Sequence, residues 1–447
     1  GAGIRFAAGG GLLVLGLFLV HFVLGLSLSV APWLFVGIAA AGCVVGILRY
    51  RRALDVPGLI IHPLIALPAF AFLVGAMNDH GSYIVYSWDE FSNWLYWARE
   101  AWLLDTIRAP GMFWQNMAYP QGLPLALAFP NLFFDTYENS RSLVVQFLWH
   151  VGLLALFYDV VTRIMSRSFE FDIATARIIA WLFILGSLAL EVTWTLVPQF
   201  LLSEKPQIYF LAGTIGLVLL ALFDADYRQN TWFLISIGLV ASVGYLLKPS
   251  YIVFVPVLTL FALVVAWQSR LKWSGIASII NKRTISTFLL ILGPFVLVYF
   301  GWAGFLPFEK RGGCTADPLI VLHTLPQLWT DHETVVAPFF SALGSYLVSF
   351  KPQLTVIALI GVAVAFCDRR TAPVGFGLVL YAFGYVLALL VLYSACFSPY
   401  ESAALSSFRR YTRVVLRLIH LVGPLLFIIV ALRILDKYWY NITRNVM

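Results

Sequence analysis

Long apolar segments dominate the chain and constrain its fold more than any other feature. A segment of about 20 mostly apolar residues can cross the hydrocarbon core of a bilayer as one helix. About twelve such segments occur, at 8–28, 31–48, 58–77, 142–162, 174–196, 206–223, 231–247, 250–267, 285–303, 353–367, 373–394 and 414–433. Because lipid offers no hydrogen-bond partners, the backbone of each segment must satisfy itself as a helix. The sequence therefore predicts an all-α polytopic membrane protein with about twelve transmembrane helices.

The composition agrees with a membrane protein. Hydrophobic residues make up 61% of the chain and charged residues only 11%, whereas soluble globular proteins carry about 25% charged residues. The formal net charge of +7 is typical of the excess of Arg and Lys in the cytoplasmic loops of membrane proteins. No basic and aromatic nucleic-acid motif accompanies this charge. We therefore expect membrane lipids, and no nucleic acid, among the partners of this chain.

The distribution of positive residues predicts the orientation. Arg and Lys follow even-numbered apolar segments, at 49–52, 163–167, 270–283, 369–370 and 433–437. Such loops stay in the cytoplasm, so both termini are expected there. Three longer polar loops, at about 78–140, 304–337 and 395–413, follow odd-numbered segments and are expected on the exoplasmic side. Cys314 and Cys396 lie in two of these loops, where a disulfide between them can form.

The first of these loops contains aromatic residues at helical spacing. Between Ser87 and Leu104, Trp and other apolar residues recur on one face, with charged residues between them. This pattern is typical of an amphipathic helix lying in the membrane interface. A second helix of this kind is expected at 122–134, after the turn formed by Pro120, Gln121 and Gly122.

Two adjacent carboxylates, Asp89 and Glu90, lie at the start of the first interfacial helix. A carboxylate at the boundary between water and lipid can accept a proton from a hydroxyl nucleophile, or hold a divalent cation such as Mg²⁺ or Mn²⁺. The alternative is structural, with the pair capping the helix and complementing its dipole. The residues alone leave both interpretations open.

Three arginines form a second candidate group. Arg409, Arg410 and Arg413 precede the last apolar segment on the expected exoplasmic side, against the usual distribution of positive charge. A guanidinium group pairs bidentately with phosphate, so a functional anion would explain these residues. Contact with anionic lipid headgroups, or a misassigned helix, are the alternatives.

Further charged residues lie at short turns on the same expected side. Lys248 precedes Pro249, and the pair Glu204-Lys205 precedes Pro206. Each proline suits the first turn of a following helix. Snorkelling of a lysine from a helix end is the alternative to a functional role. The predicted spans themselves are nearly free of ionisable residues, and the exceptions gather near their exoplasmic ends.

Three short motifs resemble bacterial members of the GT-C glycosyltransferase superfamily. These proteins are polytopic enzymes that use sugars linked to polyprenyl phosphate. Residues 86–94 resemble the acidic stretch in their first long exoplasmic loop, and residues 119–125 resemble the Tyr-Pro-Pro-Gly stretch that follows it. Residues 406–411 resemble their late Ser-Phe-Glu-Arg-Tyr stretch, with Arg409 in place of the acidic residue.

The resemblance implies a domain division and a set of roles. Residues 1–57 would be an N-terminal addition of two helices, and residues 58–447 the GT-C-like domain. Asp89 would be the catalytic base, with Glu90 as its neighbour or substitute, and this pair would hold a divalent cation if one binds. The donor phosphate would be held by Arg410, Arg409, Arg413 and Lys248. The acceptor or a cation would be contacted by Glu204, Lys205, Tyr119 and Gln121.

The implied function is transfer of a sugar from a polyprenyl-phosphate donor to a glycan or glycolipid acceptor. The reaction would take place at the exoplasmic face of a bacterial plasma membrane, with inversion, in cell-envelope glycan synthesis. A transporter or flippase of lipid-linked saccharides is one rival interpretation. Such proteins carry ionisable groups near the bilayer midplane, whereas the predicted spans of this chain are nearly free of them. A polysaccharide polymerase or ligase with a diphosphate-linked donor is the second rival. A purely structural membrane protein is the third.

Overall fold

The structure is a computed structural model that describes most of the chain. The described residues are 2–22, 24–50, 55–77, 94–106, 121–193, 204–268, 282–305, 326, 330, 332–349, 361, 370–395, 402, 404–405 and 408–446. Asp89, Glu90, Tyr119, Cys314, Cys396 and nearly all of the predicted span 353–367 lie outside these residues.

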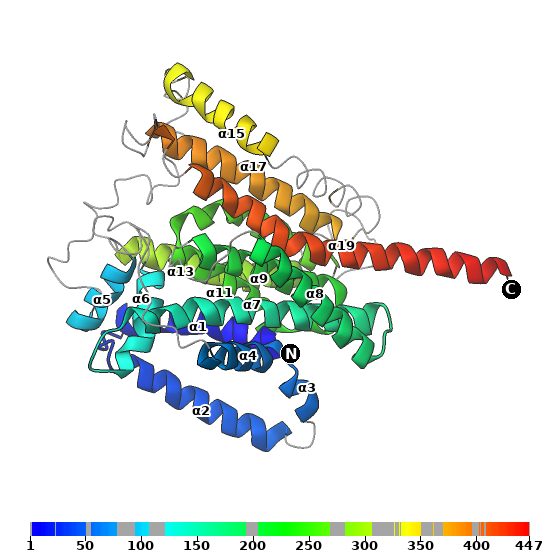
Figure 1. Cartoon of the computed structure of the whole chain (residues 1–447), viewed down its shortest axis with the longest axis horizontal. Helices are drawn as coiled ribbons and strands as arrows, with labels where there is room; N and C mark the ends of the chain where they lie inside the picture. The colour runs from blue at the N-terminus through cyan, green and yellow to red at the C-terminus, as the bar shows by residue number, and fades with distance from the viewer. Residues whose placement is uncertain are drawn as a thin grey trace. The chain divides into compact units, whose positions relative to one another are not determined.

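All regular structure in the described part of the chain is helical (Figure 1). The α-helices are α1 (Ala2–Phe22), α2 (Ala31–Tyr50), α3 (Val56–Ile60), α4 (Pro63–Met77), α5 (Leu95–Leu104), α6 (Gly122–Ala128), α7 (Asn139–Ser168), α8 (Ile173–Thr193), α9 (Glu204–Phe223), α10 (Ala225–Gln229), α11 (Thr231–Leu247), α12 (Val255–Gln268), α13 (Lys282–Phe305), α15 (Ala337–Ser349), α17 (Ala372–Ala395) and α19 (Phe408–Val446). The short helices η3 (Phe129–Phe133), η4 (Pro249–Phe254) and η7 (His332–Val336) adjoin α6, α12 and α15.

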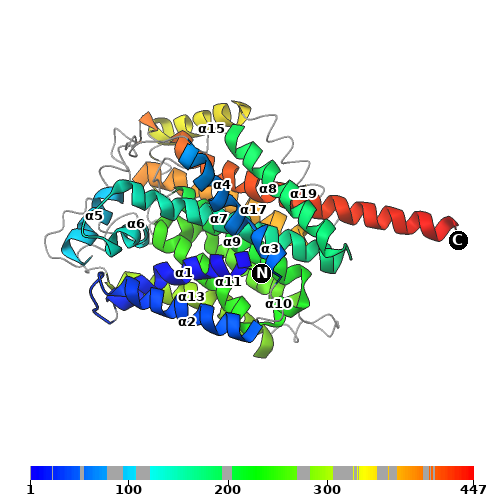
Figure 2. The same cartoon turned by 60° about the horizontal axis from the view of Figure 1, so that its bottom comes forward.

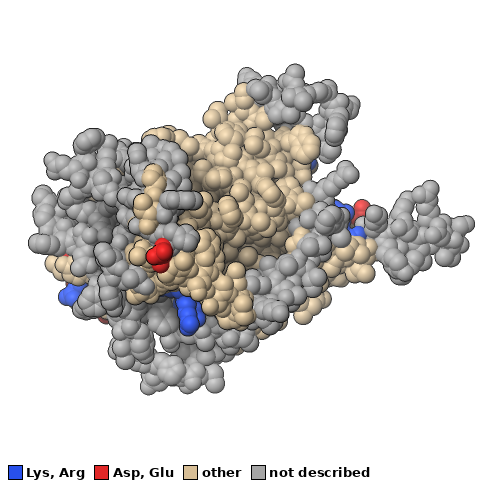
Figure 3. Space-filling view, turned by 90° about the horizontal axis from the view of Figure 1, so that it is seen from above, with Lys and Arg blue, Asp and Glu red and all other residues tan. Residues whose placement is uncertain are grey.

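Seven described segments are long and apolar enough to cross a membrane: Ala2–His21, Asn139–Ser168, Glu204–Phe223, Ser250–Gln268, Thr284–Trp302, Ala372–Ser394 and Phe408–Leu435. Five shorter apolar helices accompany them. The described surface in Figure 3 is almost entirely uncharged, as lipid contact requires. The chain is therefore an integral, multi-pass, all-helical membrane protein. The number twelve stays a prediction.

Several helices begin and end where the sequence predicts. The structure places α11 at Thr231–Leu247 and α17 at Ala372–Ala395, within one residue of the predicted spans. The helix predicted at 87–104 is confirmed over its described part, α5, which buries Trp97 and Ala98 and exposes Leu103. Its location in the membrane interface stays a prediction. The second predicted interfacial helix forms as α6 and η3. However, α6 is buried on all sides, so it is a packed helix and not an amphipathic surface helix.

Three predicted boundaries were wrong, two of them for a local reason. The first helix ends at Phe22 and not at residue 28, because Gly25 takes a positive φ of 68° that no helix allows. The predicted span 58–77 is broken between α3 and α4 at His62, since a residue before proline disfavours helical geometry. The last helix begins at Phe408, six residues before the prediction, so the three arginines lie in its first turns and not in a loop.

The described helices pack as two compact units. Unit 1 comprises 1–159, 188–213 and 239–248, and unit 2 comprises 160–187, 214–238 and 249–447. The boundaries fall inside α7, α8, α9 and α11. The division of the chain at residue 57, which the motifs imply, stays a prediction.

In unit 1, α1 packs very closely against α7. A Cβ atom on Gly3 would lie 2.2 Å from the backbone of Ala155, and one on Gly152 would lie 2.6 Å from the ring of Phe6. Both glycines are therefore required for the two helices to approach this closely. Helix α6 packs on α1 and α5, which lie near it in both Figure 1 and Figure 2.

In unit 2, α12 packs against α13 and α17. A Cβ atom on Gly377 would lie 2.7 Å from the ring of Phe261, so α17 approaches α12 closely there. Phe339 of α15 contacts Tyr393 of α17 and Phe408 of α19 through ring pairs with centroids 6.0 and 5.2 Å apart. Arg163 Nε donates to Asp224 Oδ2 at 2.6 Å. Aromatic packing and this ion pair stabilise unit 2.

Candidate functional site

An ion pair between two separate helices forms the centre of the candidate site in unit 1. Lys248 follows the last residue of α11, and Glu204 is the first residue of α9. Lys248 Nζ donates to Glu204 Oε1 at 2.5 Å, and the two side chains are only 8% and 5% exposed. Glu204 also complements the dipole at the N-terminus of α9. Two charges this deeply buried are costly unless they are well paired or have a function.

The predicted motif residue Gln121 lies at the same end of unit 1. It is fully buried and precedes α6. A Cβ atom on the next residue, Gly122, would lie 2.7 Å from the Cβ and carbonyl oxygen of Leu246, near the C-terminus of α11. The start of α6 is therefore pressed against the residues that lead into Lys248. Only glycine at position 122 permits this approach.

A hydrogen-bond network holds this end together. Asn131 Nδ2 donates to Ser142 Oγ at 3.3 Å, and Ser142 Oγ donates to the Leu127 carbonyl at 2.9 Å. Trp102 Nε1 of α5 donates to the Asn131 carbonyl at 3.0 Å. Burial raises the pKa of Tyr137 to about 12, although its hydrogen bond with Ser142 acts in the opposite direction. The network fixes α5 and α6 on the start of α7.

Further polar side chains are buried near the ends of these helices. Lys205 and Gln207, in the first turn of α9, are 5% and 0% exposed. Gln146 of α7 is 3% exposed, and neither its amide nitrogen nor its amide oxygen has a hydrogen-bond partner among the described residues. A buried amide without partners costs free energy. Gln146 is therefore available to bind water or a ligand.

The three predicted arginines lie in unit 2, on the first two turns of α19. Arg409 and Arg413 are exposed, and Arg410 is half-buried. Arg410 Nη2 donates to the Tyr411 hydroxyl at 3.0 Å, and its guanidinium carbon lies 4.9 Å from the Tyr411 ring centroid. The helical spacing adds Arg417, one turn beyond Arg413, to the same side of α19.

The structure brings some predicted site residues together and leaves others untested. Glu204 and Lys248 are bonded to each other, and Gln121 lies beside the end of α11. Arg410 and its neighbours form a separate group in the other unit. Within the described residues, no three His, Cys, Asp or Glu side chains gather as a metal site would require.

Sequence reasoning missed three charged residues inside the predicted spans, namely Asp159, Arg177 and Arg417. Asp159 lies within α7, where its Oδ1 is 3.4 Å from His62 Nε2 and its Oδ2 accepts from the Ile4 amide at 3.2 Å. Arg417 lies within the apolar part of α19. The signal was present, since any ionisable residue inside a predicted span is a candidate for function or for fixing helices.

Comparison of the chain with protein-family models, with characterised proteins and with solved structures finds no match. The case for a function therefore rests on the residues and their arrangement.

Proposed function

We propose that the protein is a membrane glycosyltransferase that moves a sugar from a polyprenyl-phosphate donor to a glycan or glycolipid acceptor at the exoplasmic face. The supporting observation is the convergence of Gln121, Glu204 and Lys248. They come from three separate stretches of sequence, and all three are buried at one end of unit 1. Residues that serve only as helix caps or snorkelling ends would be exposed to the interface.

The proposed reaction is a single displacement at the anomeric carbon of the donor sugar. Asp89 takes the proton from the acceptor hydroxyl, and the acceptor oxygen forms a bond to the anomeric carbon. The bond from that carbon to the phosphate oxygen breaks, and its electron pair leaves with the lipid phosphate. Because the attack is a single displacement, the anomeric configuration inverts. Positive side chains stabilise the phosphate, whose charge grows in the transition state.

The buried charges at the end of α9 and α11 suit a phosphate or hydroxyl ligand. Lys205 and Lys248 are both buried there, and Lys248 pairs with the carboxylate of Glu204. Desolvated lysines attract an anion strongly because the surrounding dielectric is low. We propose that Lys248 supports the leaving phosphate and that Glu204 orients Lys248.

The test is a transfer assay with purified protein in lipid nanodiscs. The donors would be radiolabelled polyprenyl-phosphate hexoses and pentoses, and the acceptors would be membrane glycans. Asp89→Asn keeps the size of the side chain but removes its basicity, so the rate should fall about 10²–10⁴-fold. Asp172→Asn, at an exposed carboxylate outside the proposed site, is the control and should retain full activity. Full activity in Asp89→Asn, Glu90→Gln and Glu204→Gln would contradict the mechanism.

One observation favours a second candidate, a transporter or flippase of lipid-linked saccharides. Asp159, which contacts His62, lies within the candidate span of α7, and proton-coupled transporters carry ionisable groups inside their spans. The two candidates differ in product. A transferase changes the mass of the acceptor, whereas a flippase moves the lipid-linked sugar across a vesicle membrane without chemical change.

A further inference from the structure

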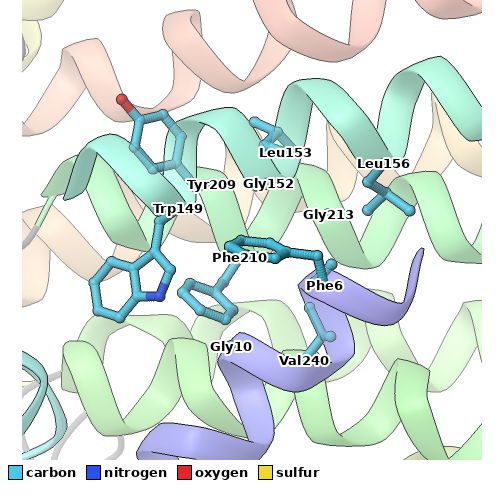
Figure 4. A pocket seen from close by; sticks show the side chains of 11 residues that line it. Phe6, Gly10, Trp149, Gly152, Leu153, Leu156, Tyr209, Phe210, Gly213 and Val240 are labelled. Carbon is cyan, nitrogen blue, oxygen red and sulfur yellow. The ribbon is translucent and has the colours of Figure 1, made fainter. Parts of the chain in front are cut away.

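The cavity between α1, α7, α9 and α11 of unit 1 is too small for an organic ligand (Figure 4). Its volume is about 30 Å³, which holds little more than one water molecule. Its walls are mostly apolar, and the rings of Trp149 and Phe210 meet there edge to face with centroids 5.3 Å apart. The cavity is therefore a packing defect between helices, and a larger ligand needs an open surface.

Two arginines of unit 2 converge on one buried aromatic ring. The guanidinium carbon of Arg370, just before α17, lies 5.7 Å from the ring centroid of Phe223. The guanidinium carbon of Arg433, in α19, lies 5.9 Å from the same centroid and 4.8 Å from the ring centroid of Phe169. These four residues, here called the Phe223 cluster, come from four separate stretches of sequence. The fold therefore brings two positive groups together at one place.

The ring contacts position the guanidinium groups by their flat faces. In a cation–π contact the face of the guanidinium lies over the ring, whereas its N–H donors lie in the plane of the group. Phe223 is only 7% exposed, but Arg370 is exposed and Arg433 is half-buried. The ring thus supports both arginines from the protein side, and Arg370 faces the surroundings.

The charge balance of this region favours an anion. The two aspartates that follow Phe223 both pair with Arg163, at 2.6 and 3.3 Å, and the neighbouring Arg228 offsets the second of them in formal charge. The residues that adjoin the two arginines of the cluster cancel one another: Asp368 with Arg369, and Asp436 with Lys437. The positive charges of Arg370 and Arg433 are therefore in excess.

The Phe223 cluster lies at the boundary of the predicted membrane region. Four candidate spans begin or end within two residues of one of its members: Asn139–Ser168, Glu204–Phe223, Ala372–Ser394 and Phe408–Leu435. The polar headgroups of a bilayer lie just outside the hydrocarbon that such spans cross. The cluster is therefore at the depth of the lipid phosphates.

We propose that the Phe223 cluster binds the phosphate group of an anionic phospholipid. Each guanidinium group can donate two parallel hydrogen bonds to phosphate oxygens. Basic residues between transmembrane helices recognise anionic headgroups in this way. A zwitterionic phospholipid offers the same phosphate but adds a cation, which the excess positive charge of the cluster repels. The site does not depend on the proposed transfer reaction.

Native mass spectrometry of the full-length chain in detergent tests this site, because it resolves the binding of single lipids. The protein is titrated with phosphatidylglycerol and, separately, with phosphatidylcholine, which carries the same phosphate but no net charge. Wild type should bind phosphatidylglycerol more tightly. Arg370→Ala and Arg433→Ala should each weaken that binding about fivefold, the contribution of one basic residue near a membrane surface, and leave phosphatidylcholine binding unchanged.

Two further variants separate a built site from diffuse attraction. Arg141 also lies over a ring, with its guanidinium carbon 3.9 Å from the ring centroid of Phe134, but it is near the start of α7, at the other end of that helix from Phe169. Arg141→Ala changes the net charge by the same amount and should leave phosphatidylglycerol binding unchanged. Phe223→Leu keeps every charge but removes the ring that supports both arginines, so it should weaken binding severalfold.

Thermal unfolding in detergent establishes that each variant is folded. If an alanine variant does not fold, Arg370→Lys and Arg433→Lys keep the charge but lose the bidentate fork, and they should still weaken phosphatidylglycerol binding. The proposal is overturned if folded variants at Arg370 and Arg433 bind as tightly as Arg141→Ala, or if Phe223→Leu binds as tightly as wild type.

Two comparisons require no variant. Equal affinity of wild type for phosphatidylglycerol and phosphatidylcholine would overturn the proposal, because the cluster would then not select an anionic headgroup. Equilibrium dialysis with radiolabelled inorganic phosphate distinguishes the lipid from a free anion. Free phosphate should bind far more weakly than phosphatidylglycerol, and an equal affinity would show that the lipid is not the ligand.

Discussion

Two buried polar contacts lie near opposite ends of α1 in unit 1, and they differ in what they join. Near the N-terminus of α1, Asp159 of α7 contacts His62 and the amide of Ile4. Near its C-terminus, where α5 and α6 pack, Glu204 pairs with Lys248. The first contact fixes the starts of α1 and α4 on α7. The second joins two helix ends beside a predicted motif.

The comparison shows why burial alone does not identify a site. Asp159 accepts from a backbone amide and contacts a histidine side chain, so holding neighbouring helices together is enough to explain why it is buried. By contrast, the full-charge pair of Glu204 and Lys248 carries a large desolvation penalty, and an apolar pair would stabilise the fold at least as well. The presence of the charges therefore points to a role in binding or chemistry.

The largest expected effect concerns the ion pair. Glu204→Met or Lys248→Met alone leaves one buried charge without its partner and should destabilise the protein by about 3–5 kcal/mol. The double variant Glu204→Met with Lys248→Met should regain most of that stability, because two apolar side chains replace two desolvated charges. Thermal unfolding in detergent measures both effects.

The double variant also separates structure from function. If the pair contributes to sugar transfer, the refolded double variant should remain inactive in the transfer assay. If activity returns together with stability, the ion pair is structural and the contrast between the two contacts is lost.

The second prediction concerns Asp159. Asp159→Ala removes the acceptor of the Ile4 amide and the partner of His62, and should cost about 1–3 kcal/mol. Asp159→Asn keeps an acceptor and should cost less. Hydrogen exchange should increase at the first turn of α1 in Asp159→Ala but not in α11. Loss of lipid-linked sugar movement in a stable Asp159→Asn variant would favour the transporter and reverse the assignment of roles.

The sequence predicted the helical membrane fold well, and the site less completely. Apolar length predicts where helices begin and end, so the bounds of α11 and α17 agree with the prediction to within one residue. Local backbone chemistry ends α1 before Gly25 and breaks the helix before Pro63, and neither break is visible in the length of the apolar segment. Charge at turns identified Glu204 and Lys248, but their pairing depends on which helix ends meet in space. That contact joins residues 44 positions apart and has no local signal.

The smallest expected effect tests whether burial, and not the number of hydrogen bonds, determines how much a carboxylate contributes to the stability of the fold. Asp172 precedes α8 and accepts three hydrogen bonds, from the Ala174 amide, the Thr175 amide and the Thr175 hydroxyl. It is exposed, however, so solvent screens it. Asp172→Ala should therefore lower the midpoint of thermal unfolding less than Asp159→Ala does.

The pH dependence of this cap has a defined sign. The hydrogen bonds from Thr175, its side chain first, lower the pKa of Asp172 below its ordinary value. A lowered pKa in the folded state means that the cap stabilises fully above the unfolded pKa of about 3.9 and is lost as the pH falls through the folded pKa. Wild type and Asp172→Ala should thus converge in stability only in strong acid. If the difference in stability between wild type and Asp172→Ala persists in strong acid, the charge of Asp172 does not act as a cap. If Asp172→Ala destabilises the protein more than Asp159→Ala at neutral pH, hydrogen-bond number outweighs burial in this chain. Burial would then no longer distinguish the pair of Glu204 and Lys248.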